Sequence, residues 1–231
     1  MLSKADLFAR LAEGHASRVT VVTPNMRLSQ ALMSEFDDFQ INKQLTVWEA
    51  PDILPFGAFV QRLYEDGLYS DLSSELPMLL TPAQEEERWS QVLAGSGLLA
   101  VESTAAKCRD AWNLANLWRI RPGTGNQDTE AFSSWLGKYL EKTEGDIDAA
   151  RLPDLLHTWL SELKLPKTLV AYAFDILPPQ TREFLDALDV EVLFSRPEAR
   201  SAVLSKGAFD SARQELDSAA RWARGRVEAG A

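Results

Sequence analysis

The 231-residue sequence has few of the side chains that build disulfide frameworks and metal sites. Its single cysteine, Cys108, excludes an internal disulfide and is typical of a reducing, cytoplasmic location. Its two histidines, His15 and His157, stand alone, without the cysteine or carboxylate spacing of a zinc site. The sequence therefore predicts neither a catalytic metal nor a Cys/His dyad, and no bound cofactor.

Long apolar runs and an excess of positive charge are also missing. No run approaches the roughly 18 apolar residues that a membrane-spanning helix needs, so no membrane partner is expected. The formal net charge is −10. Nucleic-acid binding draws much of its affinity from Lys and Arg side chains that replace counterions on phosphates. Any contact with DNA must therefore be local, or be supplied by other parts of a longer protein.

The phosphate loop of nucleotide-binding folds is absent as well. That loop needs the pattern G-x-x-x-x-G-K-[ST], in which backbone amides surround the phosphates and the lysine neutralises them. The only Gly-Lys pair, Gly137–Lys138, lies inside a helical pattern and is followed by Tyr139 instead of Ser or Thr. ATP hydrolysis by this chain alone is therefore not expected.

The N-terminal segments nevertheless begin like a nucleotide-binding fold. A β-branched strand at 19–22 ends at Pro24, and the next segment has helical spacing of Leu28, Ala31, Leu32 and Phe36. A second strand is predicted at 45–48 and a second helix from Phe56. Further strands are expected at 168–173 and 190–194. Strands that alternate with helices across short connections predict a mostly parallel sheet.

The middle of the chain changes to helical periodicity with few β-branched runs. Thr81 is the predicted N-cap of one helix, with Pro82 at its first position and Gln84 three residues after the cap. More helices are expected over 103–120, 131–143 and 152–163, with a loop at 121–129. The change in periodicity predicts a helical subdomain inserted into the sheet domain.

The sequence therefore divides into three predicted parts. Residues 1–79 and 164–210 form a split α/β core, and residues 80–163 form the inserted helical subdomain. Residues 211–231 begin a further region with an amphipathic helix from Ser211. No strand follows that helix, which favours a chain cut from something longer.

Polar residues gather where the first strand and the strand at 168–173 end. Thr23, Asn25 and Arg27 follow the first strand, at the edge where parallel sheets bind ligands. The alternative interpretation is that Thr23 or Asn25 simply caps the next helix. Asp175 stands where nucleotide-fold ATPases keep a magnesium-binding Asp-Glu pair, but Ile176 follows it. We favour a carboxylate that caps the turn into the following helix.

Two other patterns suggest a nuclease site and base stacking, but their helical spacing favours neither. Pro153–Asp154 and Glu162–Lys164 spell the PD…ExK letters of a magnesium nuclease, whose carboxylates must converge on one metal. The intervening spacing is helical, which would separate Asp154 and Glu162 by roughly 12 Å along one axis. The tryptophans could stack on bases, but their helical spacing favours a role in the core: Trp89, Trp112, Trp118, Trp135 and Trp159.

Three segments resemble motifs of UvrD/Rep-type superfamily-one helicases. VTVVTPNMRLSQALMSEF resembles motif Ia, which lies against single-stranded DNA, and PDILPFGAFVQRLYED resembles motif Ib. TLVAYAFDILPPQTREFLDAL resembles motif II, with the acidic pair reduced to Phe174–Asp175 and with Gln180 opening the helix. FDSARQELDSAARWARGRVEAG is similar to the segment that opens the second helicase domain.

Together with TPN-x-RL, PDILP and TPAQE, these segments are most similar to bacterial probable DNA repair proteins, which resemble AddB/RexB and RecB-family exonucleases. The resemblance implies a P-loop NTPase-like (RecA-like) sheet with a helical insertion and no phosphate loop. It also implies that the PD-(D/E)XK nuclease lies outside these residues. This chain would then not be an enzyme by itself.

The resemblance implies a non-catalytic helicase-like domain that positions DNA, single-stranded or at a duplex end, or that supports a nuclease or helicase partner subunit. Binding by this chain alone is expected to be weak. Thr23, Asn25 and Arg27 should lie exposed together near Pro55–Phe56, with Phe56 stacking on a base. Two alternatives stay open: a nucleotide- or small-molecule-binding Rossmann-like enzyme, and a structural scaffold for repair subunits.

Overall fold

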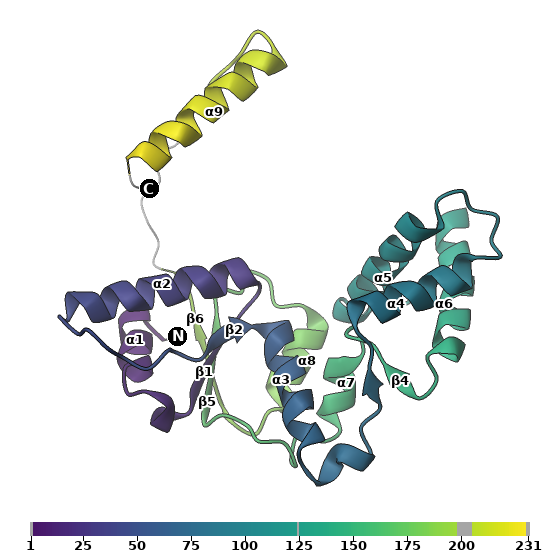
Figure 1. Ribbon diagram of the computed structural model, residues 1–231, viewed down its shortest axis with the longest axis horizontal. Coiled ribbons are helices and arrows are strands. Elements are labelled where there is room, and N and C mark those ends of the chain that lie inside the picture. Colours follow the sequence, from purple (N-terminus) through teal and green to yellow (C-terminus); the bar gives the residue numbers. More distant parts are fainter. Residues whose placement is uncertain (1, 124, 198–204, 230–231) are drawn as a thin grey trace. The chain divides into compact units, whose positions relative to one another are not determined.

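The computed structural model describes residues 2–123, 125–197 and 205–229, and contacts divide the chain into two units, the second beginning after Pro197. A four-stranded sheet organises the first unit (Figure 1). Its strands are β1 (Val19–Thr23), β2 (Ile53–Pro55), β5 (Thr168–Tyr172) and β6 (Glu191–Ser195). Their order is β2-β1-β5-β6, and every neighbouring pair is parallel. The predicted α/β fold with a mostly parallel sheet is confirmed.

The two central strands form because their side chains suit burial on both faces. All five residues of β1 and all five of β5 are buried, and most are β-branched or apolar. Val19 of β1 pairs with Thr168 of β5, and Thr23 pairs with Pro55 of the edge strand β2. The carboxyl ends of these three strands therefore lie side by side.

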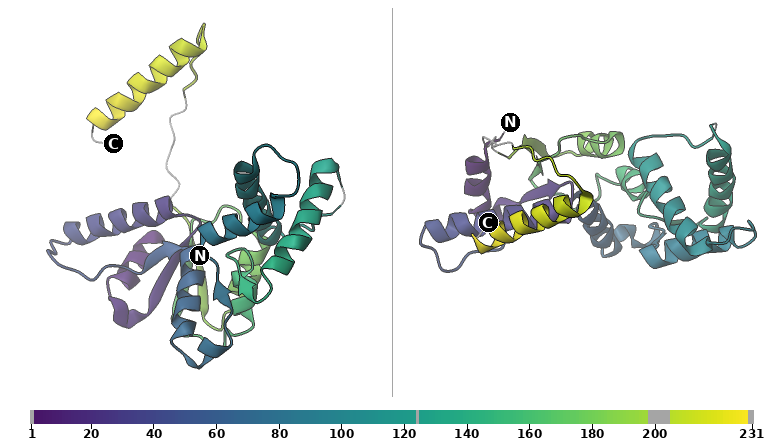
Figure 2. Two further views of the ribbon diagram at one scale, coloured as in Figure 1. Left: turned by 45° about the vertical axis from the view of Figure 1, so that its right-hand side comes forward. Right: turned by 90° about the horizontal axis from the view of Figure 1, so that it is seen from above.

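Helices cover both faces of this sheet. On one face, α1 (Lys4–Leu11) and α2 (Met26–Asn42) pack on Val21 and Val170. On the other face, α3 (Phe56–Leu68), α7 (Leu152–His157) and α8 (Pro179–Ala187) pack on the opposite side chains of β1 and β5. Figure 2 shows the sheet and these helices from two further directions. Short 3-10 turns occur at His15–Ser17 and Asp71–Ser74.

The strand predicted at 45–48 is wrong. Leu45 and Val47 are exposed, and Trp48 instead donates its indole N–H to Asp37 of α2 at 2.8 Å. The real partner of β1 is Ile53–Pro55. A proline-containing segment can serve there because β2 is an edge strand, whose outer N–H groups need no ladder partner.

The chain leaves the sheet layer through β3 (Met78–Leu79) and returns through β4 (Asp146–Ile147), which pair in parallel. Between them lie α4 (Pro82–Leu93), α5 (Val101–Leu117) and α6 (Gln127–Lys142). These helices enclose a separate core, in which Trp89 and Tyr139 stack with ring centroids 4.1 Å apart. The predicted capping box of Thr81 and Gln84 is confirmed.

The helix predicted over 152–163 is shorter than expected. It ends at His157, and turns follow to 163. This helix, α7, packs in the core of the sheet layer with α3 and α8, although the prediction grouped it with the insertion. The three-part division of the chain stays a prediction, and positions 1, 124, 198–204 and 230–231 of its ranges lie outside the described residues.

The second unit contains α9 (Ala212–Glu228). The Ser211 side chain accepts a hydrogen bond from the backbone N–H of Gln214, so the predicted start of this helix is confirmed. None of its residues is buried, and Leu216, Trp222 and Val227 are exposed. Among the described residues, no helix combines the length and apolar character that crossing a bilayer requires.

Candidate functional site at the carboxyl edge of the sheet

The turn after β1 holds the first three predicted site residues, but only two of them reach the surface. Thr23 is fully buried, and its hydroxyl donates to the backbone carbonyl of Asn25 at 2.9 Å and shares a hydrogen bond with the Ser29 hydroxyl at 2.7 Å. The expectation that Thr23 is exposed is wrong, because the strand end packs under α2. Its hydroxyl instead fixes the shape of the turn.

Asn25 and Arg27 are exposed at the start of α2. The Asn25 side chain accepts the backbone N–H of Leu28 at 3.0 Å, which confirms the helix-capping alternative for this residue. The guanidinium of Arg27 has neither an ion pair nor a hydrogen bond with any described residue. A helix N-terminus with a free cation beside it is favourable for a negatively charged group.

Phe56 lies next to this turn because Pro55 pairs with Thr23. As the first residue of α3, Phe56 is half-buried, and its ring meets Phe184 edge-to-face with centroids 5.7 Å apart. The expected proximity of Phe56 to the first turn is confirmed. Part of the Phe56 ring is covered by the core, so a base could stack only on the part that remains exposed.

The two residues assigned to the degenerate motif II behave differently from each other. Asp175 is exposed beyond β5, and α8 begins after Pro178 without a side-chain cap, so the capping interpretation of Asp175 is wrong. Gln180 is only 4% exposed. Its amide nitrogen donates to the Ala150 carbonyl at 2.8 Å and to the Asp154 carboxylate at 3.1 Å. Gln180 thus ties α8 to α7 and to the loop before α7.

A cleft of about 960 Å³ opens at this edge. It receives residues from the turns after β1, β2 and β5, represented by Pro24, Phe56 and Phe174, and from α3, α4 and α5. The connection from β1 leads to β2 on one side, and the connection from β5 leads to β6 on the other. Such reversal points, outside the carboxyl ends of parallel strands, are where open α/β sheets bind ligands.

Close to the cleft, an arginine two residues after α5 connects three helices. Arg119 donates to Asp154 at 2.6 and 2.8 Å and to Glu183 at 2.5 and 3.0 Å. The hydrogen bonds that Arg119 donates to Asp154 and Glu183 raise the pKa of Arg119. Burial alone would raise the pKa of Asp154, but the hydrogen bonds from Arg119 and Gln180 outweigh it and lower that pKa. These contacts join α5 of the insertion to α7 and α8.

The same contacts bear on the PD…ExK letters. Asp154 is engaged by a guanidinium and an amide, while Glu162 lies exposed in the turns after α7. The predicted reason for separating them, a shared helix, is wrong because the helix ends at His157. No group of three or more His, Cys, Asp and Glu side chains suited to a metal occurs in the part of the chain that the structure describes.

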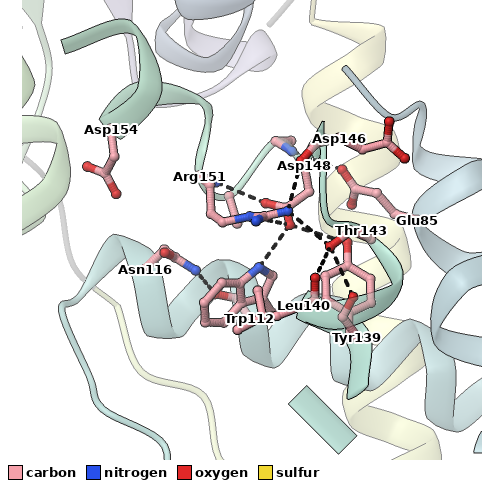
Figure 3. Close-up of polar contacts among 12 residues, drawn as sticks. Glu85, Trp112, Asn116, Tyr139, Leu140, Thr143, Asp146, Asp148, Arg151 and Asp154 are labelled. Carbon is pink, nitrogen blue, oxygen red and sulfur yellow. Dashed lines mark hydrogen bonds and ion pairs between the residues drawn. The ribbon is translucent and has the colours of Figure 1, made fainter. Parts of the chain in front are cut away.

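A buried polar cluster lies where the insertion returns to the sheet layer (Figure 3). Asp148 is fully buried and accepts from Arg151 Nε at 2.8 Å, from the indole N–H of Trp112 at 3.1 Å and from the Tyr139 hydroxyl at 3.3 Å. Burial, reinforced by the nearby Asp148, raises the pKa of Tyr139. The cluster therefore connects α5, α6 and the loop after β4.

Glu85 of α4 lies beside this cluster and lines the cleft. It is 3% exposed, and one of its oxygens accepts the backbone N–H of Ala149 at 2.9 Å. Burial raises the pKa of Glu85, with a further contribution from the charge of Asp148. A carboxyl group with a raised pKa in a cleft is a feature common at ligand sites.

The tryptophans serve mainly as packing residues. Trp89 is fully buried, Trp112 and Trp135 pack against the core of the insertion, and Trp159 packs against the sheet core. The core interpretation is confirmed for these four. Trp118, at the end of α5, is 39% exposed.

Neither the scan of family models nor the search of curated proteins finds a match for this chain. The sequence reasoning missed Glu85, Arg119 and Asp148, whose partners lie far away along the chain. Only Glu85 carried a local signal, because a carboxylate one position after the capping residue Gln84 falls on the same face as the apolar Trp89.

Proposed function

We propose that this chain is a non-catalytic, RecA-like helicase domain of a DNA repair nuclease, which positions DNA or supports a partner subunit. The observation that carries the proposal is the neighbourhood of β2, β1 and β5. The turns that follow these strands are the segments that resemble motifs Ib, Ia and II. Parallel pairing brings the three turns to one edge, which a DNA-facing surface of this kind requires.

Electrostatics supports a local contact with phosphate rather than an extended one. The chain carries a net charge of −10, so it provides little general attraction for DNA. Arg27 offers a local positive charge at this edge, since it is exposed, has no carboxylate partner among the described residues and lies next to the N-terminal amides of α2. Contacts of this kind position a strand without reading its sequence.

The lack of a phosphate loop supports a positioning role rather than a motor. Charge compensation of a triphosphate needs a lysine, Mg²⁺ and acidic groups together. In the turn after β5, where nucleotide-fold ATPases keep an Asp-Glu pair, this chain has the single acidic residue Asp175 followed by Ile176. The small-molecule alternative keeps some support from the cleft, because ligands of open α/β sheets bind in this place.

The test is an anisotropy titration of labelled single-stranded and tailed duplex DNA at low and at higher salt. We expect weak binding that salt weakens further. Arg27→Glu should reduce the affinity several-fold without unfolding the protein. The matched control is Lys138→Glu, which makes the same charge change on the exposed side of α6, where Lys138 has no side-chain partner among the described residues.

Equal losses in both variants would show that net charge alone governs binding, and the specific role of the first turn would be wrong. Retained binding in folded Arg27→Glu would place the DNA contact elsewhere on the chain, and no DNA binding by the wild-type chain would favour the scaffold alternative. Binding of ATP, ADP or NAD in a thermal-shift screen, together with no affinity for DNA, would favour the small-molecule alternative.

A further inference from the structure

The cleft contains two buried polar side chains that each keep one oxygen without a partner. Glu85 and Gln180 are 3% and 4% exposed, and both line the cleft. Glu85 uses Oε1 to accept from Ala149, and Gln180 uses its amide nitrogen to donate to Ala150 and Asp154. No described residue donates to Glu85 Oε2 or to Gln180 Oε1. Both oxygens remain open to the cleft, since the enclosed side-chain atoms without a partner among the described residues are Gln40 Oε1, Trp89 Nε1 and Ser195 Oγ.

Glu85 and Gln180 both contact one short segment of the cleft lining. Their side chains are anchored to adjacent residues, because Glu85 binds the N–H of Ala149 and Gln180 binds the carbonyl of Ala150. Glu85 comes from α4 and Gln180 from α8, so the insertion and the sheet layer each supply one acceptor. The short segment between them forms a shared wall of the site.

The other residues that line the cleft indicate the shape and polarity of the ligand. Apolar and aromatic side chains predominate, among them Phe56, Val60, Leu79, Leu117, Phe174 and Ile176. Arg109 also lines the cleft, but its charge is already paired with Glu86 and Asp110. A flat apolar body with hydrogen-bond donors therefore suits the cleft, whereas an anionic group finds no unpaired cation among the described lining residues.

We propose that this cleft binds a planar aromatic ring that carries an exocyclic amino group, with Glu85 and Gln180 as its polar contacts. The amino group supplies N–H donors for the two free acceptors. When Glu85 is protonated, its Oε2 instead donates to the ring nitrogen beside the amino group, while the amino group donates to Gln180 Oε1, and the raised pKa of Glu85 favours that state. Adenine and cytosine have this edge, either as free nucleosides or as unpaired bases of a single strand.

The ligand test compares adenosine with inosine by isothermal titration calorimetry on the full 231-residue chain. Inosine has nearly the same shape but an oxo group in place of the amino group. We expect adenosine to bind roughly tenfold more tightly, because the oxo group of inosine cannot donate a hydrogen bond to Glu85 or Gln180. Short oligodeoxyadenosine and oligodeoxyinosine strands form the second arm. If the chain prefers adenosine to inosine but shows no preference between the two strands, the ligand is a small molecule. If it prefers oligodeoxyadenosine to oligodeoxyinosine, the ligand is an unpaired base.

Two variants locate the site. Gly57→Trp places an indole in the cleft from the first turn of α3, where an added Cβ meets no atom within 4 Å, so folding should survive while adenosine binding is lost. Glu85→Gln should lower adenosine affinity and remove its pH dependence. The control, Glu65→Gln, makes the same change at an exposed position of the same cleft and should leave binding unchanged.

Three results would each overturn the inference. They are equal affinity for adenosine and inosine, no binding of either the nucleosides or the strands, and unchanged adenosine binding in folded Gly57→Trp. The outcome is independent of the proposed function, because the DNA contact of Arg27 is measured with a different variant. A nucleoside preference that persists in Arg27→Glu would support the cleft even if the DNA-positioning role fails.

Discussion

Removal of the Asp148 carboxylate should destabilise the first unit strongly. Asp148 is fully buried, and its carboxylate accepts hydrogen bonds from Arg151, Trp112 and Tyr139. In Asp148→Ala the Arg151 guanidinium, which is only 25% exposed, loses its carboxylate while it remains mostly shielded from water. Breaking a buried ion pair by deleting one partner costs about 3–5 kcal/mol. For a unit of this size, that loss lowers Tm by roughly 6–20 °C.

The assay is urea unfolding followed by tryptophan fluorescence, which reports on the insertion through Trp89, Trp112 and Trp135. Asp146→Ala is the matched control, because the Asp146 side chain lies two residues away and makes no hydrogen bond or ion pair with described residues. It should change the free energy of unfolding by less than about 1 kcal/mol. If the free energy of unfolding of Asp148→Ala also falls by less than about 1 kcal/mol, the buried ion pair does not stabilise the unit as expected, because water would then replace the carboxylate.

Three further properties follow from the same contacts. The raised pKa of Glu85 means that the contribution of Glu85 to the free energy of unfolding falls as pH rises above 4.5, so the stability of Glu85→Gln relative to wild type should increase in urea titrations from pH 4 toward pH 8. The pKa of Asp154 is lowered, so its contribution should disappear as pH falls through that pKa, and Arg119→Met should flatten this acid dependence. Burial raises the pKa of the Cys108 thiol to about 11, so iodoacetamide should label it at pH 8 far more slowly than in the urea-unfolded chain.

The sheet was predictable where the sequence itself encodes burial. Val19–Thr23 and Thr168–Tyr172 are continuous runs of β-branched or apolar residues, and both became central strands. The edge strand Ile53–Pro55 was missed because its prolines suggest a break, and only its place at the edge makes them acceptable. Propensity favoured 45–48, but the indole of Trp48 packs on α2 instead.

The polar junctions could not be predicted from local patterns. Arg119 meets Asp154 and Glu183 across 35 and 64 positions, and Glu85 meets Ala149 across 64. Such pairs depend on how the insertion returns to the sheet layer, which no periodicity specifies. The site at the first turn was only partly predictable for a related reason. Its residues follow from the sequence, but the burial of Thr23 follows from the packing of α2 over the strand end.

Photocrosslinking tests the DNA-positioning role most directly. Single-stranded DNA that contains bromodeoxyuridine is irradiated with the full chain at low salt, and crosslinked peptides are mapped by mass spectrometry. We expect crosslinks in the turns after β1 and β2, around 24–28 and 55–57, and their loss in Arg27→Glu but not in Lys138→Glu. Crosslinks that fall only in α9 or on α6, or that persist unchanged in Arg27→Glu, would contradict a DNA-facing edge formed by the turns of the parallel sheet.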